Sequence, residues 1–433
     1  MTNIANAQNP FFEKYTTPYG TVPFDKIKNE HYEPAIREGI SRQAAEIDAI
    51  VNNPEAPTFA NTILAYEKSG ELLDRVTTVF GNLRSAETND DLQKIAQEMI
   101  PLLSEHSNNI SLNQELFERI KVVYGQKDSI ELTPEQTKLL ENAYNGFIRR
   151  GANLQGADKE KYRELSRQLS LLTLQFSENN LKETNDYQLV LTDEAQLKGL
   201  PQSAIDAAAE TAREKQQEGW VFTLHAPSYV PFLTYAADRD LRKEIYMAYN
   251  TKCTHANACN NLDIVKQLVN TRLALAQLLG YKDYATYKLE HRMAQNSANV
   301  YHLLDQLLEA YKPTAQKEYA EVQALAREEQ GDDFTLMPWD WSYYSQKLKD
   351  RKFSLNDEML RPYFELENVK KGVFGLATRL PKESRHPRLS QRRGGLRCIR
   401  QRRQLPRRTL YRLPPAQRQA FGRLDDQLQG TMD

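Results

Sequence analysis

The sequence predicts a mainly α-helical protein with one small antiparallel β element near residues 187–225. Three observations lead to this fold class. Apolar residues recur at steps of three and four from about residue 25 to residue 370, which is the spacing of one helix face. Helix start and stop signals stand beside several of these stretches. Strand-like alternation is confined to two short stretches.

The helical spacing is clearest in three apolar stripes. They are Tyr162, Leu165, Leu169, Leu172 and Phe176; Ile63, Tyr66, Leu73, Val76, Phe80 and Leu83; and Val300, Leu303, Leu304, Leu307 and Tyr311. Residues 133–136, Thr-Pro-Glu-Gln, combine a capping-box pattern with proline at the first helical position, so a helix should begin there. Gly280 should end a helix, and Pro313 should open or kink another.

Two stretches show the alternation of strands, residues 187–192 and residues 220–225. They could pair as a small antiparallel element. Residues 202–217 between them follow a helical pattern. No repeat of fixed period indicates a solenoid.

Charge divides the chain near residue 381. Residues 381–433 carry thirteen arginines and one lysine against four acids, a net charge of +10, whereas the whole chain carries −1. Lysine outnumbers arginine 25 to 18 before residue 381, and this preference reverses after it. We therefore expect an N-terminal arm at 1–24, a helical body at 25–380, and an arginine-rich tail at 381–433 that is foreign to the body and disordered or non-native.

The sequence favours a cytoplasmic location. No run of eighteen apolar residues is present, so no membrane-spanning helix is expected. Residues 1–9 lack the basic and apolar regions of a secretory signal. The three cysteines, Cys253, Cys259 and Cys398, are too few for a disulfide framework.

No zinc site is expected in this chain. A zinc peptidase of the HExxH type needs two histidines four residues apart on one helix face, with a glutamate between them that takes a proton from the metal-bound water. No two of the seven histidines have this spacing: His31, His106, His225, His255, His291, His302 and His386. Glu290 precedes His291 and Glu30 precedes His31, and we interpret both as ordinary, partly exposed pairs.

Cys253, His255 and Cys259 offer the thiolate and imidazole ligands that zinc prefers, but no fourth ligand is near them. If this segment is helical, only His255 and Cys259 share a face. Thiols on a structural helix are the favoured interpretation.

The aromatic cluster Trp339, Trp341, Tyr343 and Tyr344 could line a substrate groove, although packing at a helix start is the more common role of such residues. No phosphate-binding loop, Gly-x-Ser-x-Gly elbow or kinase signature is present. We therefore assign no catalytic residue and no metal ligand, and the substrate-binding residues stay unknown.

Several ordered landmarks resemble one family. The stretch FTLHAPSYVPFLTYAADRDLR at residues 222–242 is similar to a landmark of the thimet oligopeptidase and peptidyl-dipeptidase family of zinc metallopeptidases. Further landmarks follow it or precede it at residues 262–281, 287–294, 339–344, 360–366, 369–380 and 165–181. The resemblance covers about residues 10–380, and within the family it is greatest to the bacterial peptidyl-dipeptidase.

The resemblance implies a zinc-dependent peptidase that releases dipeptides from the carboxyl ends of short peptides. It also implies a monomer whose two helical lobes form a shell around a deep channel, and this chain would supply one of those lobes. The zinc ligands of the family, its general-base glutamate and the residues that steady its tetrahedral intermediate all lie downstream of the retained block. The resemblance therefore implies zinc for the intact protein and none for this chain.

The tail begins where the family continues with alternating strands. Its content of Arg, Gln, Pro and Leu indicates codons read out of phase. Synonymous codons from Arg385 onward, reread one nucleotide later, can encode a segment that contains DFHPRNGKRSGAW, which resembles the family's next stretch. We expect a frameshift near residues 384–385, and therefore a truncated product that is inactive as written.

Two alternatives remain. The tail could be an arginine-rich arm for a polyanion, because +10 over 53 residues gives a strong, salt-dependent attraction, although its aromatic residues are too few for a specific nucleic-acid arm. Alternatively, the helical body could bind peptides without cutting them. Its helices would then expose apolar stripes that normally pack on a catalytic lobe.

Overall fold

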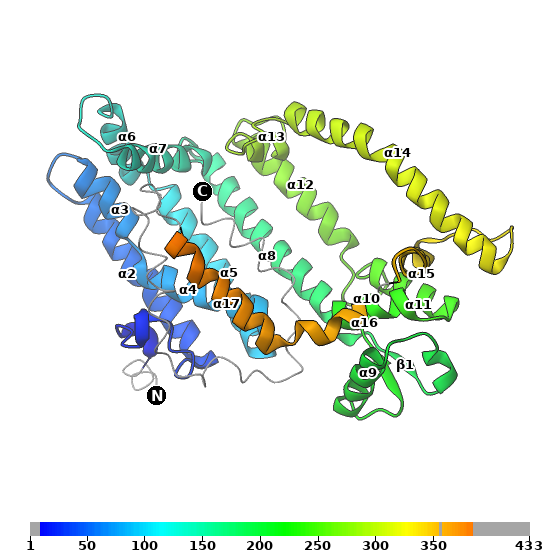
Figure 1. Cartoon of the computed structure of the whole chain (residues 1–433). Coiled ribbons are helices and arrows are strands. Elements are labelled where there is room, and N and C mark those ends of the chain that lie inside the picture. The colour runs from blue at the N-terminus through cyan, green and yellow to red at the C-terminus, as the bar shows by residue number, and fades with distance from the viewer. Residues whose placement is uncertain (1–8, 355–356, 384–433) are drawn as a thin grey trace. The chain divides into compact units, whose positions relative to one another are not determined.

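The computed structural model describes residues 9–354 and 357–383 (Figure 1). Its described part is mostly helical and contains one small antiparallel sheet, as the sequence predicts. The described residues divide into two compact units, the first formed by residues 9–183 and 253–308, the second by residues 184–252, 309–354 and 357–383. Residues 384–433, almost the whole expected tail, lie outside the described residues, and so does the expectation that they are disordered or non-native.

The first unit is built from helices that follow one another with short connections. Their bounds are η1 Pro10–Phe12, η2 Pro18–Gly20, η3 Asn29–His31, α2 Tyr32–Val51, η4 Phe59–Leu64, α3 Ala65–Lys68, α4 Glu71–Ala86, α5 Asp90–Ser111, α6 Gln114–Gly125, α7 Pro134–Arg149, α8 Ala157–Asp186, α12 Leu262–Leu278 and α13 Tyr284–Leu289. The long helix α14, Ser297–Gln330, begins in this unit and ends in the second.

The largest core of the first unit lies between α2, α4 and α5. Tyr32 and Ile36 of α2 pack against the buried apolar residues of α4 and α5. Gly39 lets α2 approach α4 closely, because a Cβ atom at this position would lie 3.0 Å from the Cα of Leu73. Phe11, in the predicted N-terminal arm, is fully buried with its ring centroid 5.4 Å from that of Tyr32.

Three further cores belong to the first unit. One joins the end of α2 to η4, α6 and α7 through residues such as Ile50, Phe117 and Phe147. Two smaller ones lie along α8: Leu172 packs with Ile264 and Leu268 of α12, and Tyr162 packs with Leu275 of α12 and with Leu112.

Two predicted helix boundaries, the start of α7 and the end of α12, are confirmed. Thr133 and Gln136 form a reciprocal capping box at the start of α7, and Pro134 is its first residue. After α12, Gly280 adopts a left-handed φ of 86°, and the amide of Tyr281 donates to the carbonyl of Ala276 at 2.9 Å. This pattern is a Schellman ending, which favours glycine because a side chain would strain it.

One detail of the predicted stripes is wrong. The stripe from Ile63 to Leu83 does not lie on one helix, because Gly70 adopts φ 77° and separates α3 from α4. Of the two roles predicted for Pro313, it does not open a helix, since α14 continues through it, and a kink stays a prediction. The stripe on α8 is confirmed as one helical face, with Tyr162 and Leu172 buried and Phe176 partly exposed at its end.

The second unit holds the sheet and shorter helices. Their bounds are β1 Leu189–Leu191, η5 Glu194–Leu197, α9 Gln202–Glu214, β2 Trp220–Phe222, α10 Ala226–Tyr235, α11 Arg239–Asn250, η6 Pro338–Asp340, α15 Trp341–Phe353, α16 Asp357–Leu360, η7 Arg361–Phe364 and α17 Leu366–Glu383. Strands β1 and β2 pair in antiparallel register with Val190 opposite Val221. The predicted β element and the helix between its strands are thus confirmed.

The core of the second unit lies where the sheet meets α9, α10 and α11. Leu191 and Phe222 of the sheet pack there with Phe232 of α10 and Ile245 of α11. At the other side of this unit, the end of α14 packs against α15. In the part of the chain that the structure describes, no helix has the length and apolar character needed to cross a membrane.

Candidate functional site

The residues first considered as metal ligands do not come together. Within residues 9–354 and 357–383, no three side chains of His, Cys, Asp and Glu form a group that could hold a metal ion. Residues 253–259 form a loop between α11 and α12, so the expected helix carrying His255 and Cys259 on one face is wrong. Cys253 takes a left-handed φ of 59°, and both thiols are buried, while the half-exposed ring of His255 lies 3.8 Å from Glu183.

The two acid–histidine pairs have structural surroundings. Glu290 accepts a hydrogen bond from the hydroxyl of Tyr281 at 2.7 Å and pairs with Arg149, while His291 is half-exposed. The Nδ1 atom of His31 accepts a hydrogen bond from the amide of Lys28 at 3.0 Å. Both pairs therefore support local structure, as interpreted from the sequence.

The second unit contains a fully buried carboxylate, that of Asp340, which is 0% exposed. It accepts hydrogen bonds from Nη2 of Arg239 at 2.7 Å and from Nη2 of Arg242 at 2.9 Å. The amide of Met337 donates to it as well, at 3.1 Å. Burial alone would raise the pKa of Asp340, but the hydrogen bonds from Arg239, Met337 and Arg242 outweigh burial and lower that pKa.

This buried network joins the start of α15 to α11 and so positions the aromatic cluster. Tyr344 is 2% exposed and packs in the core with Val322 and Leu336, which confirms the packing interpretation for this residue. Trp339 is partly buried, and its ring lies 6.1 Å from that of Tyr246. Trp341 differs from both, because 40% of its surface is exposed.

Trp341 lines a hollow of about 430 Å³, which we call the aromatic groove. Its other lining residues come from α10, α11, η6 and the start of α15: Tyr229, Val230, Leu233, Tyr246, Pro338 and Ser342. The ring of Tyr229 stacks on that of Tyr249 at 4.3 Å, and burial raises the pKa of Tyr229 to about 12. Its hydroxyl therefore stays neutral at pH 7 and can donate or accept a hydrogen bond.

The chemistry of the aromatic groove is that of binding. Aromatic and aliphatic walls with a few hydroxyl groups suit an apolar side chain of a peptide. Its lining residues include no carboxylate, imidazole or thiol. Among these lining residues, the hydroxyl groups of Tyr229, Tyr246 and Ser342 therefore have no carboxylate or imidazole beside them to act as a general base.

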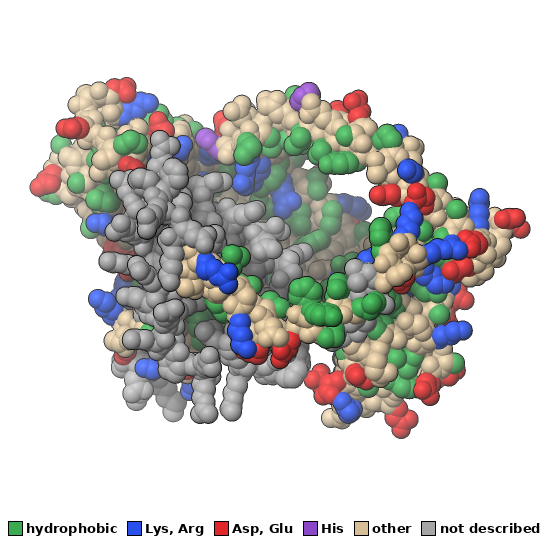
Figure 2. Space-filling view, in the orientation of Figure 1, with side chains coloured by type: hydrophobic (Ala, Val, Ile, Leu, Met, Phe, Trp, Pro, Cys, Tyr) green, Lys and Arg blue, Asp and Glu red, His purple; other side chains and the backbone are tan. Residues whose placement is uncertain are grey.

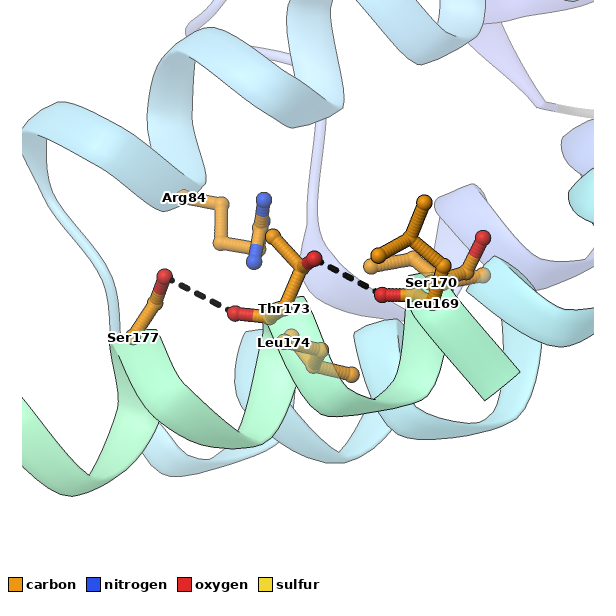
Figure 3. A pocket seen from close by; sticks show the side chains of 7 residues that line it. Arg84, Leu169, Ser170, Thr173, Leu174 and Ser177 are labelled. Atoms are coloured by element: carbon orange, nitrogen blue, oxygen red, sulfur yellow. Dashed lines mark hydrogen bonds between the residues drawn. The ribbon is translucent and has the colours of Figure 1, made fainter. Parts of the chain in front are cut away.

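A second hollow, of about 320 Å³, lies in the first unit between α4, α5 and α8 (Figure 3). Thr173 and Ser177 of α8 each donate a hydrogen bond to the carbonyl four residues before, at 2.7 and 3.0 Å. Among the described residues that line it, Arg84 alone is charged. A guanidinium beside hydroxyl oxygens can bind a carboxylate, but this hollow also offers no general base.

Sequence reasoning found Trp341 but missed the rest of the aromatic groove. Tyr229 and Tyr246 stand on separate helices, α10 and α11, and only the packing of these helices beside α15 brings them to Trp341. The Asp340 network had a signal in the sequence. Arg239 and Arg242 stand one helical turn apart, and two neighbouring arginines need an acidic partner if they are buried.

Comparison with known proteins gives a consistent assignment. Residues 232–381 match Peptidase family M3. The chain is 38% identical to the dipeptidyl carboxypeptidase of Escherichia coli (strain K12) over 374 residues, which are 86% of this chain and 55% of the relative. It is 32% identical to oligopeptidase A of Salmonella typhimurium over 376 residues, with the same two shares. A probable cytosolic oligopeptidase A of Arabidopsis thaliana is 28% identical over 385 residues, 86% of this chain and 54% of the relative.

The described fold is mainly helical, and these matches agree on one family. The chain belongs to peptidase family M3, as the resemblance of its landmarks indicated. It spans about half the length of the curated relatives that it matches.

Proposed function

We propose that this chain is the helical, peptide-binding part of a metallopeptidase that releases dipeptides from the carboxyl ends of short peptides. The observation that carries the proposal is the 38% identity with a dipeptidyl carboxypeptidase over 86% of the chain. The aromatic groove supports it, because such walls suit an apolar side chain of a peptide.

Zinc, which the resemblance implies for intact family members, does not fit the residues of this chain. The HExxH arrangement needs two histidines four residues apart, and no pair among the seven histidines has that spacing. We therefore assign no hydrolytic step to any residue here and propose that the chain is inactive by itself.

We also propose that the gene contains a frameshift near residues 384–385, which produces the arginine-rich tail. In support, the out-of-frame reading of the tail extends over nearly fifty codons and continues the family resemblance. Sequencing the gene decides this proposal, since the coding strand must then read the family's next segment one nucleotide later.

The function is tested with the full chain purified in the presence of zinc. We expect less than 0.1 zinc ion per chain (about a tenfold margin below a filled site) and no cleavage of a blocked short peptide, whereas the Escherichia coli dipeptidyl carboxypeptidase serves as the active control. Stoichiometric zinc together with turnover contradicts the proposal.

Tryptophan fluorescence should report binding of an uncleaved peptide with a large apolar side chain, and Trp341→Ala should weaken that binding about tenfold.

Two finer properties belong to the same proposal. The Arabidopsis relative is a probable cytosolic oligopeptidase A, which supports a cytoplasmic location for this chain. A monomer that acts on short peptides, with no nucleic-acid partner, is the expected form, and light scattering measures its mass.

A second candidate function rests on the net charge of +10 over residues 381–433. Such a tail should bind polyanions with strong salt dependence. Retention on heparin that disappears when residues 381–433 are removed would demonstrate this physical effect.

A further inference from the structure

The hollow between α4, α5 and α8, which we call the Arg84 hollow, has three kinds of lining residue. Arg84 supplies a guanidinium, and Figure 3 shows its side chain pointing from α4 towards Thr173 of α8. Ser170, Thr173 and Ser177 supply hydroxyl groups. The remaining described lining residues are aliphatic: Ile100, Leu169 and Leu174. All of these residues belong to the first unit, so the hollow lies within one compact part of the fold.

The guanidinium of Arg84 has no ion-pair or hydrogen-bond partner among the described residues, although the residue is partly buried. Glu178 of α8 does not pair with it and instead accepts a hydrogen bond from Gln97 at 3.0 Å. By contrast, Lys347 and Arg351 of α15 each pair with a glutamate of α14, and basic and acidic side chains lie side by side there in Figure 2. Arg84 is therefore available to an anion from outside the chain.

The hydroxyl groups of the hollow can accept hydrogen bonds from a ligand, but their own hydrogens are already used. Thr173 and Ser177 each donate to the carbonyl four residues before. Ser170 donates to the carbonyl of Ser166 at 3.0 Å or to Oγ of Ser104 at 3.2 Å. Because a hydroxyl has one hydrogen and two lone pairs, these oxygens suit a ligand that carries an N–H group beside its anionic group.

A single guanidinium without further donors favours a carboxylate over a phosphate group. The planar fork of Arg84 matches a carboxylate with parallel hydrogen bonds and balances its negative charge. A phosphate group carries close to about two negative charges and several strong acceptor oxygens, so it needs more donors than Arg84 offers. No second base lines the hollow within the described part of the chain.

We propose that the Arg84 hollow binds the carboxyl-terminal residue of a short peptide when that residue has an aliphatic side chain. Such a residue carries a carboxylate for Arg84 and an amide N–H for the oxygens of Thr173 and Ser177. Its side chain can contact the aliphatic part of the lining, and the volume of about 320 Å³ is large enough for it. The inference rests on the proposed function for the choice of a peptide, and it adds a contact in the first unit, whereas the aromatic groove lies in the second.

The test measures binding of N-acetyl-leucine to the full chain by titration calorimetry. This probe has the carboxylate, the amide N–H and the side chain of a carboxyl-terminal leucine. N-acetyl-leucinamide, which lacks the carboxylate, should bind at least about tenfold more weakly. Arg84→Gln should weaken binding of N-acetyl-leucine about tenfold, and Thr173→Val, which removes one acceptor oxygen, about threefold.

Arg37→Gln on α2 is the matched control, since Arg37 is also in the first unit and its exposed guanidinium pairs with Glu33 at 2.9 Å. It should leave binding of N-acetyl-leucine unchanged. Circular dichroism must show that each variant folds. Equal weakening in Arg84→Gln and Arg37→Gln would mean that overall charge attracts the probe, and it overturns the proposal.

Results with the ligands can also overturn it. Equal affinity for N-acetyl-leucinamide means that the carboxylate is not recognised, and no binding of N-acetyl-leucine means that there is no such site. Tighter binding of free leucine means that the hollow takes an amino acid rather than a peptide end. Displacement of N-acetyl-leucine by an equal concentration of inorganic phosphate means that the site takes any anion.

Trp341→Ala separates this site from the aromatic groove. It should leave binding of N-acetyl-leucine unchanged, because Trp341 lines the groove and not the Arg84 hollow. Loss of binding in Trp341→Ala but not in Arg84→Gln would place the probe in the groove and overturn the proposal. Binding is measured without zinc or cleavage, so failure here is distinguishable from failure of the proposed function.

Discussion

The two ends of α14 follow similar apolar spacing but have different surroundings. Val322 and Ala326, near its C-terminal end, are buried against Leu336 and Tyr344 of the second unit. Residues 301–320, towards the other end, are exposed along their whole length. Apolar periodicity in a sequence therefore identifies the face of a helix that can pack against a partner. It does not show whether that face is buried, because burial depends on which other elements lie beside it.

The packed end depends on Asp340, so the largest effect is expected from Asp340→Ala. This substitution leaves the fully buried guanidinium of Arg242 without its carboxylate and should lower the free energy of unfolding by about 3–5 kcal/mol. Urea denaturation followed by tryptophan fluorescence measures it. Glu328→Ala removes the exposed pair with Arg351 and should leave the transition almost unchanged. Equal effects would show that the buried network adds nothing beyond surface charge.

A smaller effect separates the two ends of α14 directly. Leu325 is 6% exposed and Leu304 is 51% exposed, so the same truncation can be made at each end of one helix. Leu325→Ala should cost about 2–5 kcal/mol of unfolding free energy, whereas Leu304→Ala should change it by less than about 0.5 kcal/mol. If Leu304→Ala destabilises the chain as much as Leu325→Ala, residues 301–320 are packed in solution and the comparison fails.

These contrasts also show what the sequence could predict. The periodicity of α8 and α14, the cap at Thr133 and the glycine ending at Gly280 are local signals, and each predicted its element correctly. The stripe from Ile63 to Leu83 was assigned to a single helix because the left-handed turn at Gly70 was overlooked. Glycine after serine is a common break, so that signal was present.

The site was less accessible to sequence reasoning for a physical reason. The aromatic groove and the Asp340 network join residues about one hundred positions apart, as between Arg242 and Asp340. Such pairs follow from tertiary packing rather than from local spacing. The exposure of residues 301–320 could not be predicted from the sequence either, because the apolar spacing of α14 is similar at its exposed end and at its buried end.

The smallest expected effect concerns pH and compares a buried histidine with an exposed one. His106 of α5 is buried, its Nε2 atom lies 2.8 Å from Oε1 of Gln43, and burial lowers its pKa. The unfolded chain, where the pKa of histidine is about 6.5, therefore binds more protons than the folded chain at mildly acidic pH. The stability that neutral His106 contributes is complete above that value and is lost as the pH falls through the folded pKa.

Urea denaturation at pH 7.5 and at pH 5.0 (one pH value about a unit above and one more than a unit below the unfolded pKa) measures this loss. His106→Gln should reduce the difference between the two midpoints, because glutamine does not titrate. His302→Gln, on the exposed stretch of α14, is the matched control and should leave the difference unchanged. If the difference between the two midpoints is unchanged in His106→Gln, the protonation of His106 is not linked to folding. A buried histidine on α5 and an exposed one on α14 would then have the same effect on the pH dependence of stability.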